Sequence, residues 1–172
     1  MLDRAKAIFY RGLTAVVLAA GLGVLSCNPF APGLDDAPID PNELLGDRRT
    51  LDGFFEWFRN AYELRDSVLY GQLIDPAFRF SYFDFQNNVY VSWDRDTEML
   101  STYNLFRGVQ STSLRWNNYV FVDTTGSDTV ATVERAFNLS IVQDEQNIFM
   151  GTGSAQIQLV RNAPDTPWRM RY

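Results

Sequence analysis

Residues 51–80 read LDGFFEWFRNAYELRDSVLYGQLIDPAFRF and contain the patterns of two helices and the start of a strand. In the first part, apolar residues recur at intervals of three and four, which predicts an amphipathic helix. Asp66 predicts the N-cap of a second, shorter helix, and Asp75-Pro76 predicts its end, because the residue before proline disfavours helical backbone. The apolar face of the first helix consists of Leu51, Phe54, Phe55, Phe58, Ala61 and Tyr62.

The pattern changes from Phe78 to Phe85, where apolar and polar residues alternate with a period of two. This alternation predicts a β-strand. A third helix is expected next, capped by Asp94 or Ser92, running to about Phe106 and ending at Gly108. Its inner face is expected at Leu100, Tyr103 and Phe106.

The remaining chain is rich in Val, Ile, Thr and aromatic residues, in segments separated by turn-forming residues. This composition predicts an antiparallel meander, with strands at residues 109–122, 129–142, 148–161 and 167–172. The order of elements predicts an α+β fold, in which a curved antiparallel sheet wraps around about three N-terminal helices. A span of about 120 residues is enough for one domain, residues 51–172.

This plan resembles the nuclear transport factor 2-like (NTF2-like), or SnoaL-like, superfamily of cystatin-like α+β cones, over nearly all of residues 51–172. The resemblance implies a cone-shaped domain that encloses a pocket between sheet and helices. Members include isomerases, cyclases, dehydratases, small-molecule binders and structural modules, so the fold leaves the function open. The matching segments are residues 61–70 and 73–80, Trp93 with Glu98, Leu105-Phe106, residues 155–161 and Trp168-Arg169-Met170.

The N-terminus has the pattern of a secretory signal at residues 1–26. Three basic residues precede an apolar run, residues 13–25, which is too short to cross a hydrocarbon core of about 30 Å. The run ends in Val24-Leu25-Ser26-Cys27, which resembles the lipobox of bacterial lipoproteins. The resemblance implies that Cys27 is diacylated, with palmitate-type chains, and becomes the first residue of the mature protein.

Lipidation of Cys27 would anchor the protein in a membrane of the cell envelope, since two or more acyl chains keep a protein stably bound to a bilayer. In a Gram-negative host that follows the enteric sorting rule, Asn28 favours the outer membrane, on either its periplasmic or its surface face. Two alternatives remain open, a secreted protein in which Cys27 is incidental and an uncleaved anchor. Cys27 is the only cysteine, so no internal disulfide is available.

Residues 27–50 are expected to form a tether between Cys27 and the domain. The segment combines prolines and acidic residues and offers little apolar surface to bury. The alternative is that Leu44 and Leu45 open the first helix early. The prolines are Pro29, Pro32, Pro38 and Pro41, and the acidic residues include Asp35, Asp36, Asp40, Glu43 and Asp47.

The charge of the mature chain argues against a nucleic-acid partner. Without residues 1–26 the net formal charge falls from −6 to −8, with 12 arginines against 20 Asp and Glu residues. No basic run is present to neutralise phosphates. The mature chain also lacks Lys and His.

These absences restrict the possible chemistry. A Ser-His-Asp triad, Schiff-base catalysis and a His- and Cys-based zinc site are all excluded. No nucleotide-binding or metal-binding motif is present, so neither a cofactor nor a metal is predicted. An enzyme would have to use carboxylates and tyrosines, and the candidates are Asp84, Glu98, Tyr82 and Tyr103. The alternative places Asp84 in a turn and Glu98 on a solvated helix face or beside an arginine.

Aromatic residues make up 15% of the chain, and most are expected in the core. Others could line a pocket for a small apolar ligand. We therefore expect a lipid-anchored, noncatalytic module that binds such a ligand or a protein partner. The alternatives are an isomerase or cyclase of the SnoaL type and a homodimeric scaffold that pairs through the outer sheet face. The pocket candidates are Tyr62, Tyr82, Trp93, Tyr103, Trp116 and Phe149.

Overall fold

The computed structural model of this protein describes residues 40–172, which belong to a single compact unit. The expected signal segment, Cys27 and the tether as far as residue 39 lie outside the described residues. No helix within residues 40–172 has the length and apolar character needed to cross a membrane.

The helices of the domain begin and end close to the predicted residues. Helix α3 spans Leu51–Glu63, α4 spans Ser67–Gly71 and α5 spans Arg95–Gly108. Asp66 caps α4 and Asp94 caps α5, as predicted, because each carboxylate accepts hydrogen bonds from backbone N–H groups of the first turn. Of the predicted inner face of α5, Phe106 is confirmed as buried, whereas Leu100 and Tyr103 were predicted wrongly, since they are 62% and 43% exposed and Thr102 is buried instead.

Residues 40–50 form part of the folded domain, where a tether was expected. Helix α2 spans Pro41–Leu45, and Leu45 packs against the core. Gly46 has a φ of +108°, and a side chain there would clash with the carbonyl oxygen of Gly53, so only glycine fits this turn. Arg48 then joins the segment to the domain, since it donates to the backbone carbonyl of Gln72 at 2.8 Å and accepts from Trp168 N–H.

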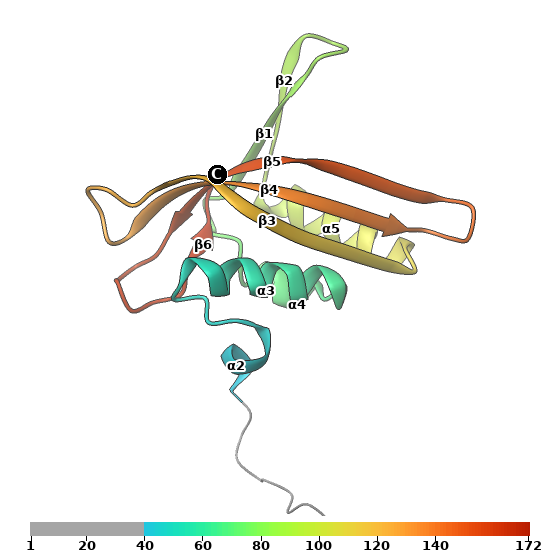
Figure 1. Cartoon of the computed structure of the whole chain (residues 1–172). Coiled ribbons are helices and arrows are strands. Elements are labelled where there is room, and N and C mark those ends of the chain that lie inside the picture. The colour runs from blue at the N-terminus through green and yellow to red at the C-terminus, as the bar shows by residue number, and fades with distance from the viewer. Residues whose placement is uncertain (1–39) are drawn as a thin grey trace, which may run out of the picture. The chain divides into compact units, whose positions relative to one another are not determined.

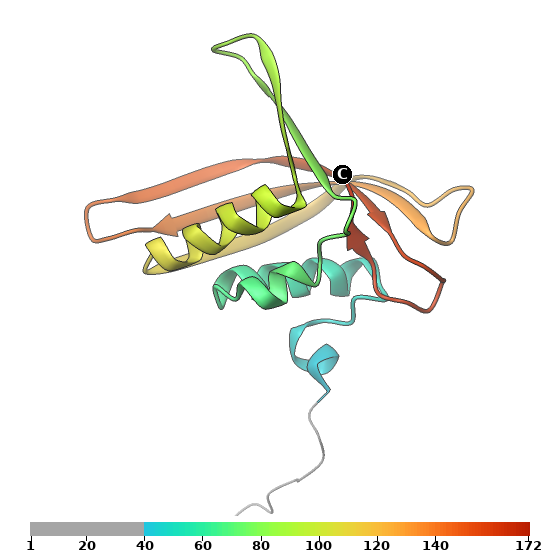
Figure 2. The ribbon, with the colours of Figure 1, turned by 180° about the vertical axis from the view of Figure 1, so that it is seen from behind.

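Four antiparallel strands form the main sheet in the order β3-β4-β5-β6. Strands β3 (Ser111–Asp123), β4 (Val130–Val142) and β5 (Ile148–Val160) match the predicted meander, whereas β6 is only Arg169–Met170. Figure 1 shows this sheet above α3, and Figure 2 shows α5 running along the same sheet from behind. The domain is therefore the predicted α+β arrangement of helices against a curved antiparallel sheet.

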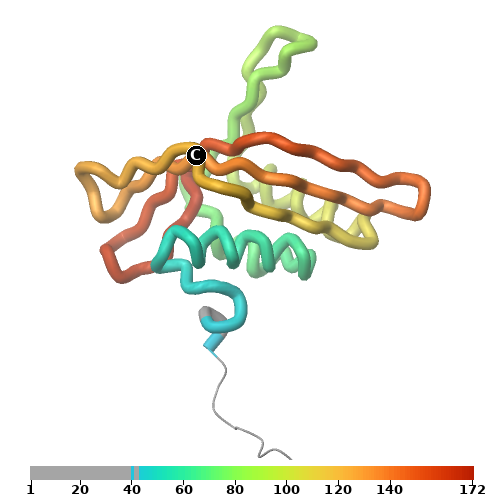
Figure 3. Tube along the Cα trace, in the orientation of Figure 1, coloured from blue at the N-terminus to red at the C-terminus, as the bar shows by residue number. Residues whose placement is uncertain are grey.

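A second, two-stranded sheet projects from the domain as a hairpin (Figure 3). The first strand, β1 (Arg79–Asp84), confirms the predicted alternation, but its partner β2 (Val89–Asp94) was not predicted. The two strands pair in register from Arg79 with Asp94 to Asp84 with Val89. The hairpin carries Phe80 and Trp93 at its base, where their rings stack with centroids 4.4 Å apart.

The core lies between α3, α4 and the inner face of the sheet. Trp57 anchors α3 to α4, since its indole N–H donates to the carbonyl of Leu69 at 3.0 Å. Aromatic side chains fill much of the volume, and apolar strand residues close it from the sheet side. The buried residues with less than 2% exposure include Phe54, Phe55, Ala61, Leu73, Ala131, Val133 and Leu159.

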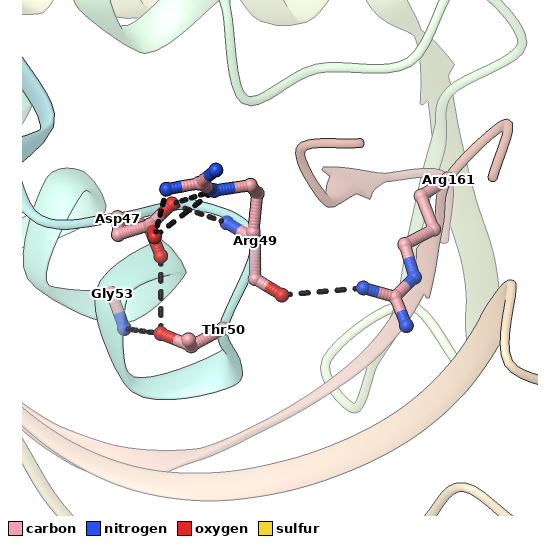
Figure 4. A network of polar contacts seen from close by, with 5 residues as sticks. All are labelled: Asp47, Arg49, Thr50, Gly53 and Arg161. Carbon is pink, nitrogen blue, oxygen red and sulfur yellow. Dashed lines mark hydrogen bonds and ion pairs between the residues drawn. The ribbon is translucent and has the colours of Figure 1, made fainter. Parts of the chain in front are cut away.

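A polar network fixes the start of α3 (Figure 4). Thr50 is the N-cap, and its hydroxyl accepts from Gly53 N–H and donates to the Asp47 carbonyl, both at 3.0 Å. Asp47 pairs with Arg49 at 2.8 Å, and Arg161, directly after β5, donates to the Arg49 carbonyl at 3.2 Å. The network thus joins the beginning of α3 to the end of the sheet.

Replacing the cap should weaken the domain measurably. Thr50→Ala removes the acceptor for Gly53 N–H, and we expect it to lower the free energy of unfolding by about 1 kcal/mol. Thr50→Ser keeps the hydroxyl and should stay within about 0.5 kcal/mol of the wild type. Urea unfolding followed by circular dichroism measures both values. If both variants lose the same free energy of unfolding, the Thr50 hydroxyl does not contribute to the stability of the domain.

Candidate functional site

A cavity of about 280 Å³ lies at the base of the hairpin, between the helices and the inner face of the sheet. Each of α3, α4, α5, β1, β2 and the main sheet contributes to its wall, so the site exists only in the folded domain. The lining residues are Phe58, Tyr62, Tyr70, Phe78, Phe80, Trp93, Glu98, Trp116, Ala155, Gln156, Ile157, Met170 and Tyr172.

The cavity has an apolar interior and an aromatic mouth. Phe58, Tyr70 and Phe78 are buried, whereas Phe80 is 38% exposed and Tyr172 is 59% exposed. A wall of this kind favours an apolar guest, since burial of its surface gives most of the binding energy.

Glu98 is the one lining residue with a charged side chain among the described residues. One carboxylate oxygen, Oε1, accepts from the Tyr70 hydroxyl at 2.6 Å and from the Thr102 hydroxyl at 3.1 Å. The other, Oε2, accepts from the Trp93 indole N–H at 2.6 Å. Within residues 40–172 no arginine forms an ion pair with Glu98. Three neutral donors therefore hold the carboxylate in one orientation.

Two tyrosines next to this carboxylate are held in their neutral form. Burial raises the pKa of Tyr62 to about 12, and the negative charge of Glu98 contributes to the shift. Burial also raises the pKa of Tyr70 well above its usual value, with further contributions from Tyr62 and Glu98. Both side chains therefore keep their hydroxyl protons at neutral pH, and that of Tyr70 is donated to Glu98.

The local sequence explains how these groups meet. Asp94 fixes the first turn of α5 by accepting from Thr97 N–H at 3.0 Å, so Glu98 lies in that turn and Thr102 lies one turn later on the same face. Asp66 fixes α4 in the same way, which places Tyr70 where its hydroxyl reaches Glu98. Trp93 immediately precedes the cap of α5 and reaches Glu98 from the end of β2.

The structure brings four of the predicted site residues together. Tyr62, Trp93 and Trp116 line the cavity with Glu98. The sequence left open that Glu98 lies on a solvated helix face or beside an arginine. In the structure its carboxylate instead accepts hydrogen bonds from Tyr70 and Trp93 in the cavity wall.

Asp84 lies outside the cavity, at the tip of the hairpin. Its carboxylate accepts from the backbone N–H groups of Gln86 and Asn87 and from the Asn87 side chain. The hydrogen bond from the Asn87 side chain is the main reason that the pKa of Asp84 is lowered. This aspartate closes the turn, which is the alternative that the sequence left open.

Three other predicted residues are also not in the cavity wall. Tyr82 is 43% exposed on β1, one pleat beyond Phe80. Tyr103 is 43% exposed, and its hydroxyl accepts from Arg107 at 2.9 Å, because it lies on the outer side of α5. Phe149 is 58% exposed near the start of β5, at the opposite end of that strand from Ile157 in the cavity wall.

Sequence reasoning missed Tyr70, Phe58, Phe78 and Phe80 as cavity residues. Tyr70 had a usable signal, since it lies four residues after the predicted cap Asp66 and thus at a defined place on α4. Phe80 had none, because its position depends on β2, which was not predicted.

A second cavity, of about 390 Å³, lies between α3 and β3 and is lined by opposite charges. Its lining has three arginines and three acidic residues. Arg59 pairs with Glu56 at 3.4 Å and Arg135 pairs with Asp52 at 3.7 Å. The charges that line this cavity therefore balance in number, and it offers no unpaired carboxylate in an apolar wall as the first cavity does. No cluster of three metal-binding side chains occurs within the described part of the chain.

Comparison with known proteins gives matches to solved structures only. No protein-family model matches the chain, and no curated protein sequence matches it. A candidate scytalone dehydratase from Novosphingobium aromaticivorans is 16% identical, with a TM-score of 0.60 over 72% of this chain and 78% of that chain. A hexachlorocyclohexane dehydrochlorinase (LinA, type 2) is 10% identical, with a TM-score of 0.55 over 77% of this chain and 85% of that chain.

A third solved structure names the fold. It is a candidate dehydratase of the NTF2-like family from Streptomyces avermitilis, 16% identical, with a TM-score of 0.50 over 69% of this chain and 87% of that chain. Identities this low establish the fold alone. The described domain of this chain is an NTF2-like α+β cone, in agreement with the expectation from its sequence.

Proposed function

We propose that this protein is a lipid-anchored envelope protein whose NTF2-like domain binds a small, largely apolar molecule in the cavity at the base of the hairpin. The observation that carries the proposal is the cavity itself, with eight aromatic side chains around one fixed carboxylate. Ligand sites typically combine an apolar wall with a few oriented polar groups. A volume of about 280 Å³ suits a small molecule rather than a peptide.

The hydrogen bonds of Glu98 favour binding over catalysis. An ionised carboxylate offers about four lone-pair sites, and three protein donors already occupy most of them. The Tyr70 hydroxyl donates to Glu98 itself, so its proton is not directed at a substrate oxygen. A fixed acceptor of this kind orients a ligand without needing to exchange a proton with it.

The second candidate function is a carboxylate- and tyrosine-dependent isomerase or cyclase. The observation that favours it is a cavity carboxylate without an arginine partner among the described residues, next to two neutral tyrosines. Proton abstraction beside a carbonyl uses such a pair, with the carboxylate as base and a hydroxyl facing the developing oxyanion. In this mechanism Glu98 would accept the proton and Tyr62 would donate to the oxygen.

The third possibility, a dimer that pairs through the outer face of the sheet, has weaker support. On that face of β5, Thr152 and Ser154 are exposed and polar, and Ile148 and Met150 at its start expose apolar side chains. On β3 and β4, Phe121 and Val130 are exposed as well. Dimerisation stays a prediction of the sequence.

The ligand should be retained through purification and should depend on the cavity volume. We expect native mass spectrometry of the protein from its own host to find a small molecule bound to the wild type. Ala155→Trp would fill the cavity and abolish retention, because Ala155 lies in its wall. Ser154→Trp, at the exposed neighbouring position, is the matched control and should retain the molecule.

Chemical change of the retained molecule distinguishes the two leading functions. If it is recovered unchanged after long incubation with the protein, the binding function is supported. Conversion that is lost in Glu98→Gln would instead identify the enzyme. If the native mass of the wild type equals that of the protein alone, as is expected for Ala155→Trp, no ligand is bound. That outcome would count against the proposed function.

The anchor rests on the lipobox-like segment that ends at Cys27. We expect Cys27→Ser to abolish incorporation of radiolabelled palmitate and to shift the protein out of the membrane fraction. Ser26→Ala, which keeps a small residue before the cysteine, serves as the control and should still be labelled. A Cys27→Ser variant that remained membrane-bound to the wild-type extent would argue for an uncleaved anchor.

Alkaline pH should destabilise the domain through the tyrosines near Glu98. The unfolded pKa of Tyr62 is about 10.0 and the folded pKa is about 12, so the folded state holds its proton more tightly. The stabilisation is therefore complete below pH 10 and lost as the pH rises toward 12, at about 1.4 kcal/mol per pH unit for this group. Urea unfolding between pH 8 and 11.5 should show a shallower decline for Tyr62→Phe than for the wild type. The exposed Tyr103→Phe is the control, and a decline identical in all three proteins would contradict the assignment.

A further inference from the structure

The carboxylate of Glu98 brings a negative charge into the cavity that the protein does not balance. Its three hydrogen-bond donors are neutral groups. The four ion pairs of residues 40–172 all involve other carboxylates. Among the described residues that line the cavity, none is basic. Glu98 is half-buried, and a cation beside a half-buried carboxylate is attracted to it more strongly than in bulk water, so the site favours a cation.

The aromatic wall has the same preference. Aromatic rings carry negative charge on their faces, and cations are attracted to these faces within about 6 Å of the ring centre. Aromatic residues account for eight of the 13 lining residues. Phe80 and Trp93 stack at the mouth, with ring centroids 4.4 Å apart. The aromatic wall and the carboxylate therefore both favour a cationic ligand.

We propose that the ligand of this cavity is a small organic cation, an alkylammonium or quaternary ammonium compound with apolar substituents. The inference rests on the proposed function, because it specifies the chemical class of the molecule bound in that same cavity. The apolar substituents contact Phe58, Trp116 and Ile157, and the positive charge lies near Glu98.

The hydrogen bonding of Glu98 favours a quaternary ammonium group over a primary amine. A primary ammonium carries three N–H donors that all need acceptors when buried. Glu98 has little acceptor capacity left, and its neighbours Tyr70, Trp93 and Thr102 use their protons to donate to it. A quaternary ammonium has no N–H group, so it gains the electrostatic attraction without leaving a donor unsatisfied. Aromatic cages bind such cations in other proteins.

Comparison of charged and neutral ligands of the same shape tests the inference. Isothermal titration calorimetry of the full chain in a non-ionic detergent would measure binding of tetramethylammonium, choline and tetraethylammonium. The neutral probe is 3,3-dimethylbutan-1-ol, which has the shape of choline with carbon in place of the charged nitrogen. We expect the best cation to bind at least about tenfold more tightly than the neutral alcohol.

Variants then assign the preference to Glu98. Glu98→Gln removes the charge at nearly constant size, and we expect it to weaken cation binding by about tenfold while binding of the neutral alcohol stays unchanged. The control is Glu63→Gln, which removes an exposed carboxylate from α3 and should leave both affinities unchanged. The wild-type comparison of choline with its neutral isostere needs no variant, so it decides the matter even if Glu98→Gln fails to fold.

The outcomes separate this inference from the proposed function. If the neutral alcohol binds as tightly as every cation, the cavity binds small molecules and the inference of a cation is overturned. If neither class binds and no molecule is retained from the host, the proposed function and the inference both fail. Equal weakening of cation binding by Glu98→Gln and Glu63→Gln would also overturn the assignment, because the effect would then come from overall charge.

Discussion

The packing of Phe58 connects the helices, the sheet and the cavity. Its ring lies 5.3 Å from Tyr62 and 5.5 Å from Tyr70, and 5.3 Å from the Trp116 ring on β3, measured between centroids. One side chain of α3 thus contacts α4 and the sheet, and it also forms part of the cavity wall. Because interiors are packed as closely as crystals, a change in this ring would displace all of these neighbours. The core and the candidate site therefore cannot vary independently.

The polar group at the centre of this aromatic packing adds a second constraint. Glu98 is stable there because Tyr70, Trp93 and Thr102 all donate to it, and each comes from a different element or turn. A partly buried network of this kind is most stable when it is satisfied as a whole, since the loss of any donor leaves a partly unpaired charge. The network therefore selects one arrangement of α4, β2 and α5 from the many that an aromatic core alone would allow.

The sequence predicted the elements that have strong local patterns. The α3 stripe, the caps Asp66 and Asp94, and the three long strands are confirmed, because periodicity and capping depend on nearby residues. Strand β2 was missed, since a short strand between a turn and a helix has no periodicity of its own. The resemblance predicted the fold and no function, and the three solved structures compared above are only 10–16% identical to this chain.

The candidate site was harder to predict, because its residues differ from similar residues elsewhere in where their side chains point and not in residue type. Tyr70 and Tyr103 are both helical tyrosines, but one donates to Glu98 and the other faces Arg107 outside. Asp84 and Glu98 are both carboxylates near aromatic residues, but the register of the hairpin places Asp84 opposite Val89 at its tip, away from the cavity. Prediction of the correct set required the register of β1 with β2, which places Phe80 opposite Trp93.

The junction of β2 and α5 explains why the wall and the carboxylate belong to one unit. Strand β2 ends at Asp94, which is also the cap of α5, so no loop separates Trp93 from the helix that carries Glu98. Trp93 stacks on Phe80 and donates to Glu98 across this junction. Any movement of the hairpin relative to α5 would therefore break the hydrogen bond to Glu98 and open the aromatic mouth at the same time. Trp93 of the wall and the carboxylate of Glu98 are consequently joined through one junction, whereas α3, α4, β1 and the main sheet supply the rest of the wall.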